Sequence, residues 1–137
     1  MRACFRLSSI SRLAESLGVN GLAWLGAYQK AKREQASFDQ GCLAIGERAL
    51  DFCREHDVIP VVVLGRPYTI YNSVLNSNVP PLLREQGAIG IPIDCYEVSD
   101  DVPTFEGVYW GHGQKNLRAA HQIRRTPGLY SIFALRA

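Results

Sequence analysis

The sequence has no long apolar run. Among its 137 residues, no stretch of about 18 apolar residues occurs, which excludes a membrane-spanning helix on length. Residues 1–14 contain arginine and serine and no acid, as organelle transit peptides do, but they lack the apolar core of a secretory signal. We expect a helix or a frayed start there, and a soluble cytoplasmic protein.

Cysteine is sparse and shows no metal-binding pattern. The four cysteines form no C-x-x-C pair and have no histidine at zinc-finger spacing; they are Cys4, Cys42, Cys53 and Cys95. Without a signal peptide, reduced thiols are expected rather than disulfides. Each cysteine by itself is expected to be a small buried or half-buried apolar residue.

Charge of one sign is missing from each of two adjacent segments. Residues 94–106 carry five acids and no lysine or arginine, whereas residues 107–137 carry five basic residues and no acid. The basic segment is therefore a candidate for contact with an anionic ligand or an acidic partner surface. The alternative is a solvated helix face beside an acidic loop. The net charge of +2 is too small to predict nucleic-acid binding.

Several motifs of hydrolytic and nucleotide-binding enzymes are also missing. The sequence contains no G-x-S-x-G elbow and no G-x-x-x-x-G-K-[ST] loop. The G-x-G of residues 111–113 follows an acidic loop and not a strand, so it is a weak nucleotide fingerprint. His112 offers an imidazole between two glycines, and the alternative is a residue that merely starts a helix. No catalytic residue is assigned.

What is present is the pattern of an α/β domain. The stretch "VIPVVVLG", residues 58–65, is an unalternating β-branched run, typical of a strand buried on both faces of a parallel sheet. The other expected helices lie over 9–34 (interrupted near 18–21), from Ser37 with Ser37 or Asp39 as cap, over 78–87 and over 107–125. The other expected strands lie over 89–93 and 128–135. This order predicts a three-layer Rossmann-like sandwich with a parallel sheet of three to four strands.

We expect two parts, an N-terminal helical segment over residues 1–36 and a partial α/β Rossmann-like domain over 37–137. In the helix over 107–125, Leu117, Ala120 and Ile123 are expected to face inward. The outward residues are expected to be Lys115, Arg118, Gln122 and Arg125. Because the last strand leaves no room for a following loop and helix, we expect a fragment of a longer protein.

The turn after the first strand is the densest candidate site, since ligands in open α/β sheets gather outside the carboxyl ends of the strands. Gly65 permits close backbone approach, Arg66 offers a planar fork for a phosphate or carboxylate, and Pro67 stiffens the turn. Further hydrogen-bonding groups come from Tyr68, Tyr71, Asn72 and Asn76. The alternative is that Arg66 pairs with an acid such as Asp94.

Two stretches carry a resemblance to a known family. "VVVLGRPYTIYNSVLNSNVPPLLREQGAIGIPID" and "YWGHGQKNLRAAHQIRRTPGLYSIF" resemble the acyl-CoA dehydratase activase-related proteins, which include regions like 2-hydroxyglutaryl-CoA dehydratase activators and benzoyl-CoA reductases. The resemblance covers residues 58–134, whereas the earlier helices fit only loosely. The residues that match the two motifs and are carried over as ligand-binding candidates are Gly65, Arg66, Pro67, Tyr68, Tyr71, Asn76, Tyr109, Trp110, Gln114 and Lys115.

The resemblance implies a module of an ATP-driven iron–sulfur electron-transfer system of anaerobic metabolism, linked to acyl-CoA dehydratase or reductase chemistry and not catalytic by itself. The implied partners are the remainder of a larger protein or an ATPase or dehydratase subunit, and a CoA-type ligand. The family's cluster-binding cysteine turn is missing after the last strand, which leaves Cys95 as the remaining candidate metal ligand.

Two other functions stay open. The first is a module that binds a phosphate, carboxylate or CoA anion at Arg66 without any metal. The second is a structural or docking fragment without activity, which would expose an apolar sheet edge and self-associate.

Overall fold

The structure is a computed structural model that describes residues 2–134, with side chains described for residues 8–134. It divides into two compact units, Met1–Phe38 and Asp39–Ala137. Each unit is described by itself below. No helix in the described part of the chain combines the length and the apolar character that crossing a membrane requires.

The first unit consists of helix α1, Arg2–Ser16, and the first part of helix α2, Ala23–His56. The break between the helices contains Gly18 and Gly21, both with left-handed backbones (φ 76° and 65°), which end a helix readily. The predicted interruption near residues 18–21 is confirmed. Within α2, the rings of Trp24 and Tyr28 make an edge-to-face contact with centroids 6.2 Å apart.

The predicted helix start at Ser37 is wrong, because α2 continues through Ser37 and Asp39 to His56. Neither glycine nor proline occurs between residues 27 and 40, so nothing in the backbone stops the helix there. Serine and aspartate favour helix caps only where the preceding backbone leaves the helical conformation. The second unit therefore begins within α2.

The second unit is built on a parallel sheet of three strands in the order β2-β1-β3. The strands are β1 (Ile59–Leu64), β2 (Ala88–Pro92) and β3 (Tyr130–Phe133). Helix α4, Val79–Glu85, connects β1 to β2, and helix α5, Gly111–Ile123, connects β2 to β3. This parallel arrangement with helical crossovers confirms the predicted α/β fold.

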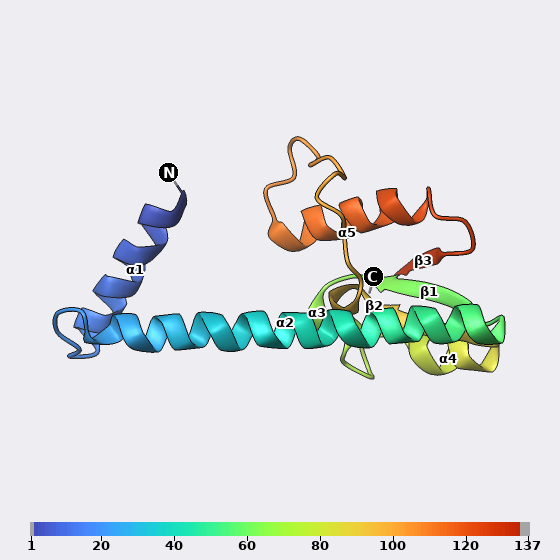
Figure 1. The fold of residues 1–137 in the computed structure, drawn as a ribbon, viewed down its shortest axis with the longest axis horizontal. Helices are drawn as coiled ribbons and strands as arrows, with labels where there is room; N and C mark the ends of the chain where they lie inside the picture. Colours follow the sequence, from blue (N-terminus) through green and yellow to red (C-terminus); the bar gives the residue numbers. More distant parts are fainter. Residues whose placement is uncertain (1, 135–137) are drawn as a thin grey trace. The chain divides into compact units, whose positions relative to one another are not determined.

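The core surrounds β1, which the two neighbouring strands cover at its edges. Val62 and Val63, on opposite faces of the sheet, are 0% and 3% exposed. Figure 1 shows α4 and α5 on opposite sides of β1. Leu83 of α4 reaches Gly90 of β2, where a Cβ atom would lie 3.1 Å from the leucine methyl. The unalternating apolar run is thus explained by burial on both faces.

The structure corrects the predicted inward face of α5 and shows where β3 lies in the sheet. Helix α5 buries Asn116, Ala119 and Ile123, whereas Leu117, which was predicted to face inward, is 41% exposed. Ile123 is buried as predicted and Ala120 is partly buried, whereas the inward position in the first half of the helix is taken by Asn116, whose polar side chain is bound at the end of β1. Strand β3, expected from its sequence as an apolar strand, is present at one edge of the sheet and is exposed at all four positions.

Two short helices follow the first two strands and were not predicted. Helix α3, Pro67–Ile70, begins directly after the turn at Gly65, and the short 3-10 helix η1, Ile93–Cys95, begins directly after β2. Both follow the carboxyl end of a strand, at the same edge of the sheet. Together with the start of α5, they surround the region in which a parallel sheet places its ligands.

Candidate functional site

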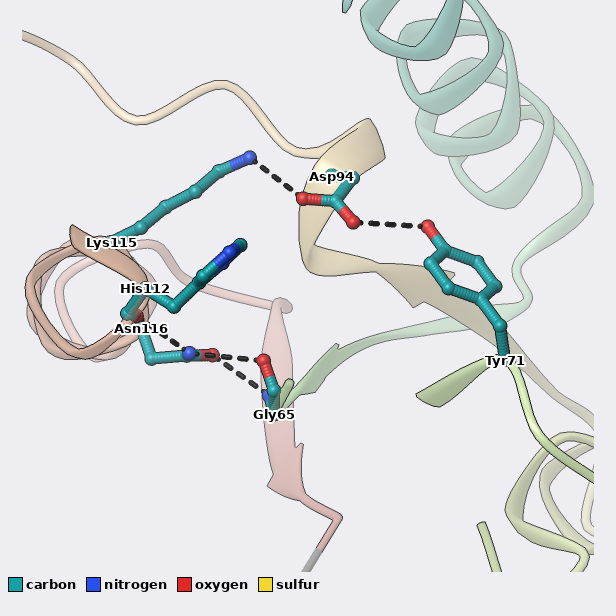
Figure 2. Close-up of polar contacts among 6 residues, drawn as sticks. All are labelled: Gly65, Tyr71, Asp94, His112, Lys115 and Asn116. Atoms are coloured by element: carbon teal, nitrogen blue, oxygen red, sulfur yellow. Dashed lines mark hydrogen bonds and ion pairs between the residues drawn. The ribbon is translucent and has the colours of Figure 1, made fainter. Parts of the chain in front are cut away.

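The turn after β1 is fixed by one asparagine of α5. The Asn116 side-chain oxygen accepts a hydrogen bond of 2.8 Å from the Gly65 N–H, and its amide nitrogen donates one of 3.0 Å to the Gly65 carbonyl. The same nitrogen donates to the His112 carbonyl at 2.8 Å. Figure 2 shows these bonds joining α5 to the end of β1. Because Asn116 is buried, its amide satisfies backbone groups that water does not reach.

Gly65 has to be glycine for two reasons. Its φ of 152° is unfavourable for residues with a side chain, and an added Cβ would lie 3.1 Å from the Ala134 carbonyl oxygen and 3.3 Å from an Ile70 carbon. The following residue, Arg66, has an extended backbone and is the N-cap of α3, with Pro67 in the first turn. The chain therefore leaves β1 in one defined direction, with the Arg66 side chain exposed.

The Arg66 guanidinium contacts aromatic residues and no acid. It donates a hydrogen bond of 2.9 Å to the Tyr68 hydroxyl, and its central carbon lies 4.9 Å from the Trp110 ring centroid. Of the ion pairs found in the described part of the chain, none includes Arg66. The alternative that Arg66 pairs with Asp94 is wrong, since that carboxylate has other partners.

Asp94 is held between α5 and the loop after α3. One carboxylate oxygen lies 3.1 Å from Lys115 Nζ, and the other accepts a hydrogen bond of 3.2 Å from the Tyr71 hydroxyl (Figure 2). Partial burial, followed by the nearby Asp94 carboxylate, raises the pKa of Tyr71 above its ordinary range. Tyr71 as a whole residue is 56% exposed, and it is the hydrogen bond to Asp94 that fixes the position of its hydroxyl.

Cys95 lies beside a second cysteine. The neighbour is Cys42 of α2, and burial, followed by the nearby Cys42, raises the pKa of Cys95. Cys42, Cys53 and Cys95 are free thiols, and the side chain of Cys4 lies outside the described residues. Among residues 8–134, no group of three or more histidine, cysteine or acidic side chains could hold a metal ion.

The basic face of α5 contacts the acidic loop that precedes it. Arg118 donates hydrogen bonds to the Val102 carbonyl at 3.0 Å and the Ser99 carbonyl at 2.8 Å. Gln122 binds the same loop, accepting from the Ser99 N–H and donating to the Glu97 carbonyl. Arg118 and Gln122, which were predicted to face outward, are thus only partly exposed, and their side chains bind the loop.

Two predicted site residues serve their own loops. Asn76 donates to the Ile70 carbonyl at 3.1 Å and accepts from the Asn78 N–H at 3.0 Å, and it is 9% exposed. Gln114 binds both backbone groups of Phe105, donating also to the Val108 carbonyl. The amide groups of Asn76 and Gln114 are therefore occupied, and these two residues shape the walls of the site.

Of the other predicted residues, the structure brings together Arg66, Tyr68 and Trp110, with Lys115 nearby at Asp94. Tyr109, the residue before Trp110, is 92% exposed. The sequence reasoning missed Asn116, which holds the turn, and Cys42, which pairs with Cys95. Asn116 lies three residues before Ala119 and seven before Ile123, on the same face of α5, but apolar periodicity gives no signal for a buried amide.

Comparison with known proteins gives one family. No curated protein and no solved structure is significantly similar to the chain. A family model described as "CoA enzyme activase uncharacterised domain (DUF2229)" matches residues 4–96, which is more than half of the chain. The match includes the N-terminal helices, which the motif resemblance fitted only loosely, and it extends through the turn at Arg66 and η1. The chain therefore belongs to this activase-related CoA enzyme family.

Proposed function

We propose that the chain is a module of a CoA enzyme activase-related protein and that it binds a phosphate-bearing anion of the CoA type at Arg66. One observation carries the proposal: an exposed guanidinium at the carboxyl end of the central strand has aromatic neighbours and no acidic partner among the described side chains. An arginine in this setting offers donors in the fork geometry that suits phosphate.

The surroundings of Arg66 suit both parts of a CoA-type ligand. Trp110, over whose ring the guanidinium lies, is the N-cap of α5, so the unpaired backbone N–H groups of the first helical turn lie near the arginine. Trp110 is 65% exposed and Tyr68 is 59% exposed, which leaves aromatic surface for an adenine ring. We propose that phosphate binds to the Arg66 guanidinium and that adenine stacks on the aromatic rings of Tyr68 and Trp110.

The wider proposal concerns the chemistry of the assembly. We propose that the module acts with the remainder of a larger protein, or with a dehydratase partner, in ATP-driven iron–sulfur electron transfer to an acyl-CoA substrate. The family description supports a link to CoA enzyme activation. The described residues do not fit a cluster by themselves, because Cys42 and Cys95 supply two thiols and an iron–sulfur cluster takes four ligands. Any cluster would need ligands from elsewhere.

The binding proposal is tested by calorimetric titration of the full chain with CoA, dephospho-CoA and inorganic phosphate. We expect CoA to bind, and we expect Arg66→Ala to weaken the binding by about tenfold or more, since a hydrogen bond to a charged group contributes about 1.5–3 kcal/mol. Arg66→Lys should recover only part of the affinity, because a lysine keeps the charge and loses the fork.

The matched control is Arg84→Ala. This arginine is exposed in the last turn of α4, before β2 begins, so it lies at the edge of the sheet opposite to Arg66. The substitution removes the same positive charge as Arg66→Ala does. Its CoA affinity should stay within about twofold of that of the unaltered chain. Equal weakening by both variants would mean a general charge effect, and failure of CoA and phosphate to bind would end the proposal.

A second candidate function is docking without a ligand, which the exposed edge strand favours. Tyr130, Ile132 and Phe133 of β3 are 57%, 39% and 49% exposed, and an apolar edge strand is a common place of association. Sedimentation at several concentrations separates the two candidates. Association that Ile132→Lys abolishes, together with absence of CoA binding, would favour docking.

A further inference from the structure

Helix α2 and the end of β2 are in direct backbone contact at one point. A Cβ atom built on Gly46 would collide with the carbonyl group of Cys95, so the helix approaches η1 as closely as a glycine allows. Cys42 lies one helical turn before Gly46 and therefore on the same face of α2. This packing brings the two cysteines together, because Cys95 Cβ lies 3.1 Å from the Cβ position built on Gly46, and the neighbouring Cys42 contributes to the raised pKa of Cys95.

From this apposition we infer that Cys42 and Cys95 form a reversible dithiol/disulfide pair that links α2 to the end of β2. The close packing at Gly46 determines which two cysteines meet. Cys53, three turns further along α2, is 2% exposed and has no such partner among the described thiols. The inference is independent of the ligand proposed for Arg66, and it assigns a modification site to two residues that have no role there.

The chemistry is thiol–disulfide exchange with a low-molecular-weight disulfide such as oxidised glutathione. One thiolate attacks the glutathione disulfide and releases one reduced glutathione, and the second cysteine then displaces the other glutathione to close the protein disulfide. Two cysteine thiols are oxidised, and one disulfide is reduced to two glutathione thiols, which carry the two protons. Electrons and atoms balance without any metal.

Cys95 lies at an open cavity, which an oxidant can enter. Cys95 lines an open cavity of about 380 Å³, whose walls include Leu50 and Glu47 of α2 and Tyr96 and Gln122. Cys42 and Cys95 are half-buried, whereas Cys53 is buried. We therefore expect initial attack at the half-buried pair, with rates that rise with pH because the thiolate is the reacting form.

The test equilibrates the full chain with glutathione buffers of increasing oxidised fraction, quenches by acid and alkylation, and maps the cysteine peptides by mass spectrometry. We expect an intact mass lower by two hydrogens and a Cys42–Cys95 peptide. The oxidised form should melt about 10 °C higher than the reduced form, because the bond closes a long loop.

Three variants make the test decisive. Cys53→Ser should form the same peptide, and Cys42→Ser should instead leave glutathione bound on Cys95, since the resolving thiol is gone. Cys42→Ala serves as a second variant in case the serine is poorly tolerated at a half-buried position. A peptide joining any other two cysteines, or only glutathione adducts in the unaltered chain, overturns the inference, and the map of the unaltered chain suffices for that decision.

Discussion

The ends of β1 and β2 lie at the same edge of the sheet and differ in how their side chains are satisfied. After β1 the backbone is held, with both polar groups of Gly65 bound to Asn116, while the Arg66 side chain has no ionic partner among the described residues. After β2 the side chains are held, with Asp94 bound to Lys115 and Tyr71, and Cys95 beside Cys42.

This difference teaches where a ligand can be expected. A charged side chain that is already paired must lose its partner before it can bind a ligand, so Asp94 and Lys115 are poor candidates despite their position. An exposed guanidinium on a rigid turn loses little on binding, because its backbone is already ordered. The end of β1 is thus suited to recognition, and the end of β2 to linking the elements of the fold.

The largest expected effect tests the packing behind the end of β2. Gly46→Ala places a methyl group on the Cys95 carbonyl, so it should destabilise the protein by about 3 kcal/mol or more, in urea unfolding followed by circular dichroism. Gly41→Ala is the matched control on the same helix, where an added Cβ meets no atom within 4 Å. It should stabilise by about 0.5–1 kcal/mol, and equal effects at both glycines would contradict the close contact.

The second effect tests the backbone anchor of the end of β1. Asn116→Ala leaves the Gly65 N–H and carbonyl without partners in a buried place, which should cost about 2–3 kcal/mol in the same unfolding measurement. The neighbouring Leu117→Ala removes an exposed side chain and should cost less than about 1 kcal/mol. A larger loss for the leucine would mean that α5 packs through the face first predicted from its sequence.

The third effect compares removal of one positive charge at each strand end. Lys115→Met breaks a half-exposed ion pair and should cost about 0.5–1 kcal/mol, whereas Arg66→Met should change the stability by less than about 0.5 kcal/mol. Both values come from chemical unfolding without ligand. A clear loss in Arg66→Met would reveal a structural partner for the guanidinium and would weaken its role in recognition.

The smallest effect is a dependence on alkaline pH at the end of β2. The folded-state pKa values of Cys95 and Tyr71 are raised, so the folded state retains their protons and is stabilised below the ordinary pKa values. This contribution should decline as the pH rises above about 8.5 for the thiol and about 10 for the phenol. Cys95→Ser should remove the earlier part of the decline, and an unchanged pH profile would argue against burial of this thiol beside Cys42.

The sequence predicted the strands and most helices because their signals are local. The β-branched run gave β1, and Gly87, with a left-handed φ of 73°, ends α4 as the pattern indicated. The helix start at Ser37 failed because capping residues do not stop a helix that continues for other reasons. The inward face of α5 failed because a polar residue, Asn116, occupies it, and apolar periodicity cannot identify a buried amide.

By itself, the sequence determined that a glycine and an arginine follow the central strand and that the chain forms a parallel α/β sheet, since both depend on residues adjacent along the chain. Only the tertiary structure decided what these residues meet. Asn116 reaches Gly65 across 51 positions and Lys115 reaches Asp94 across 21, and Cys42 meets Cys95 only through the close packing at Gly46. Such contacts depend on helix rotation and packing distance, which no local pattern encodes.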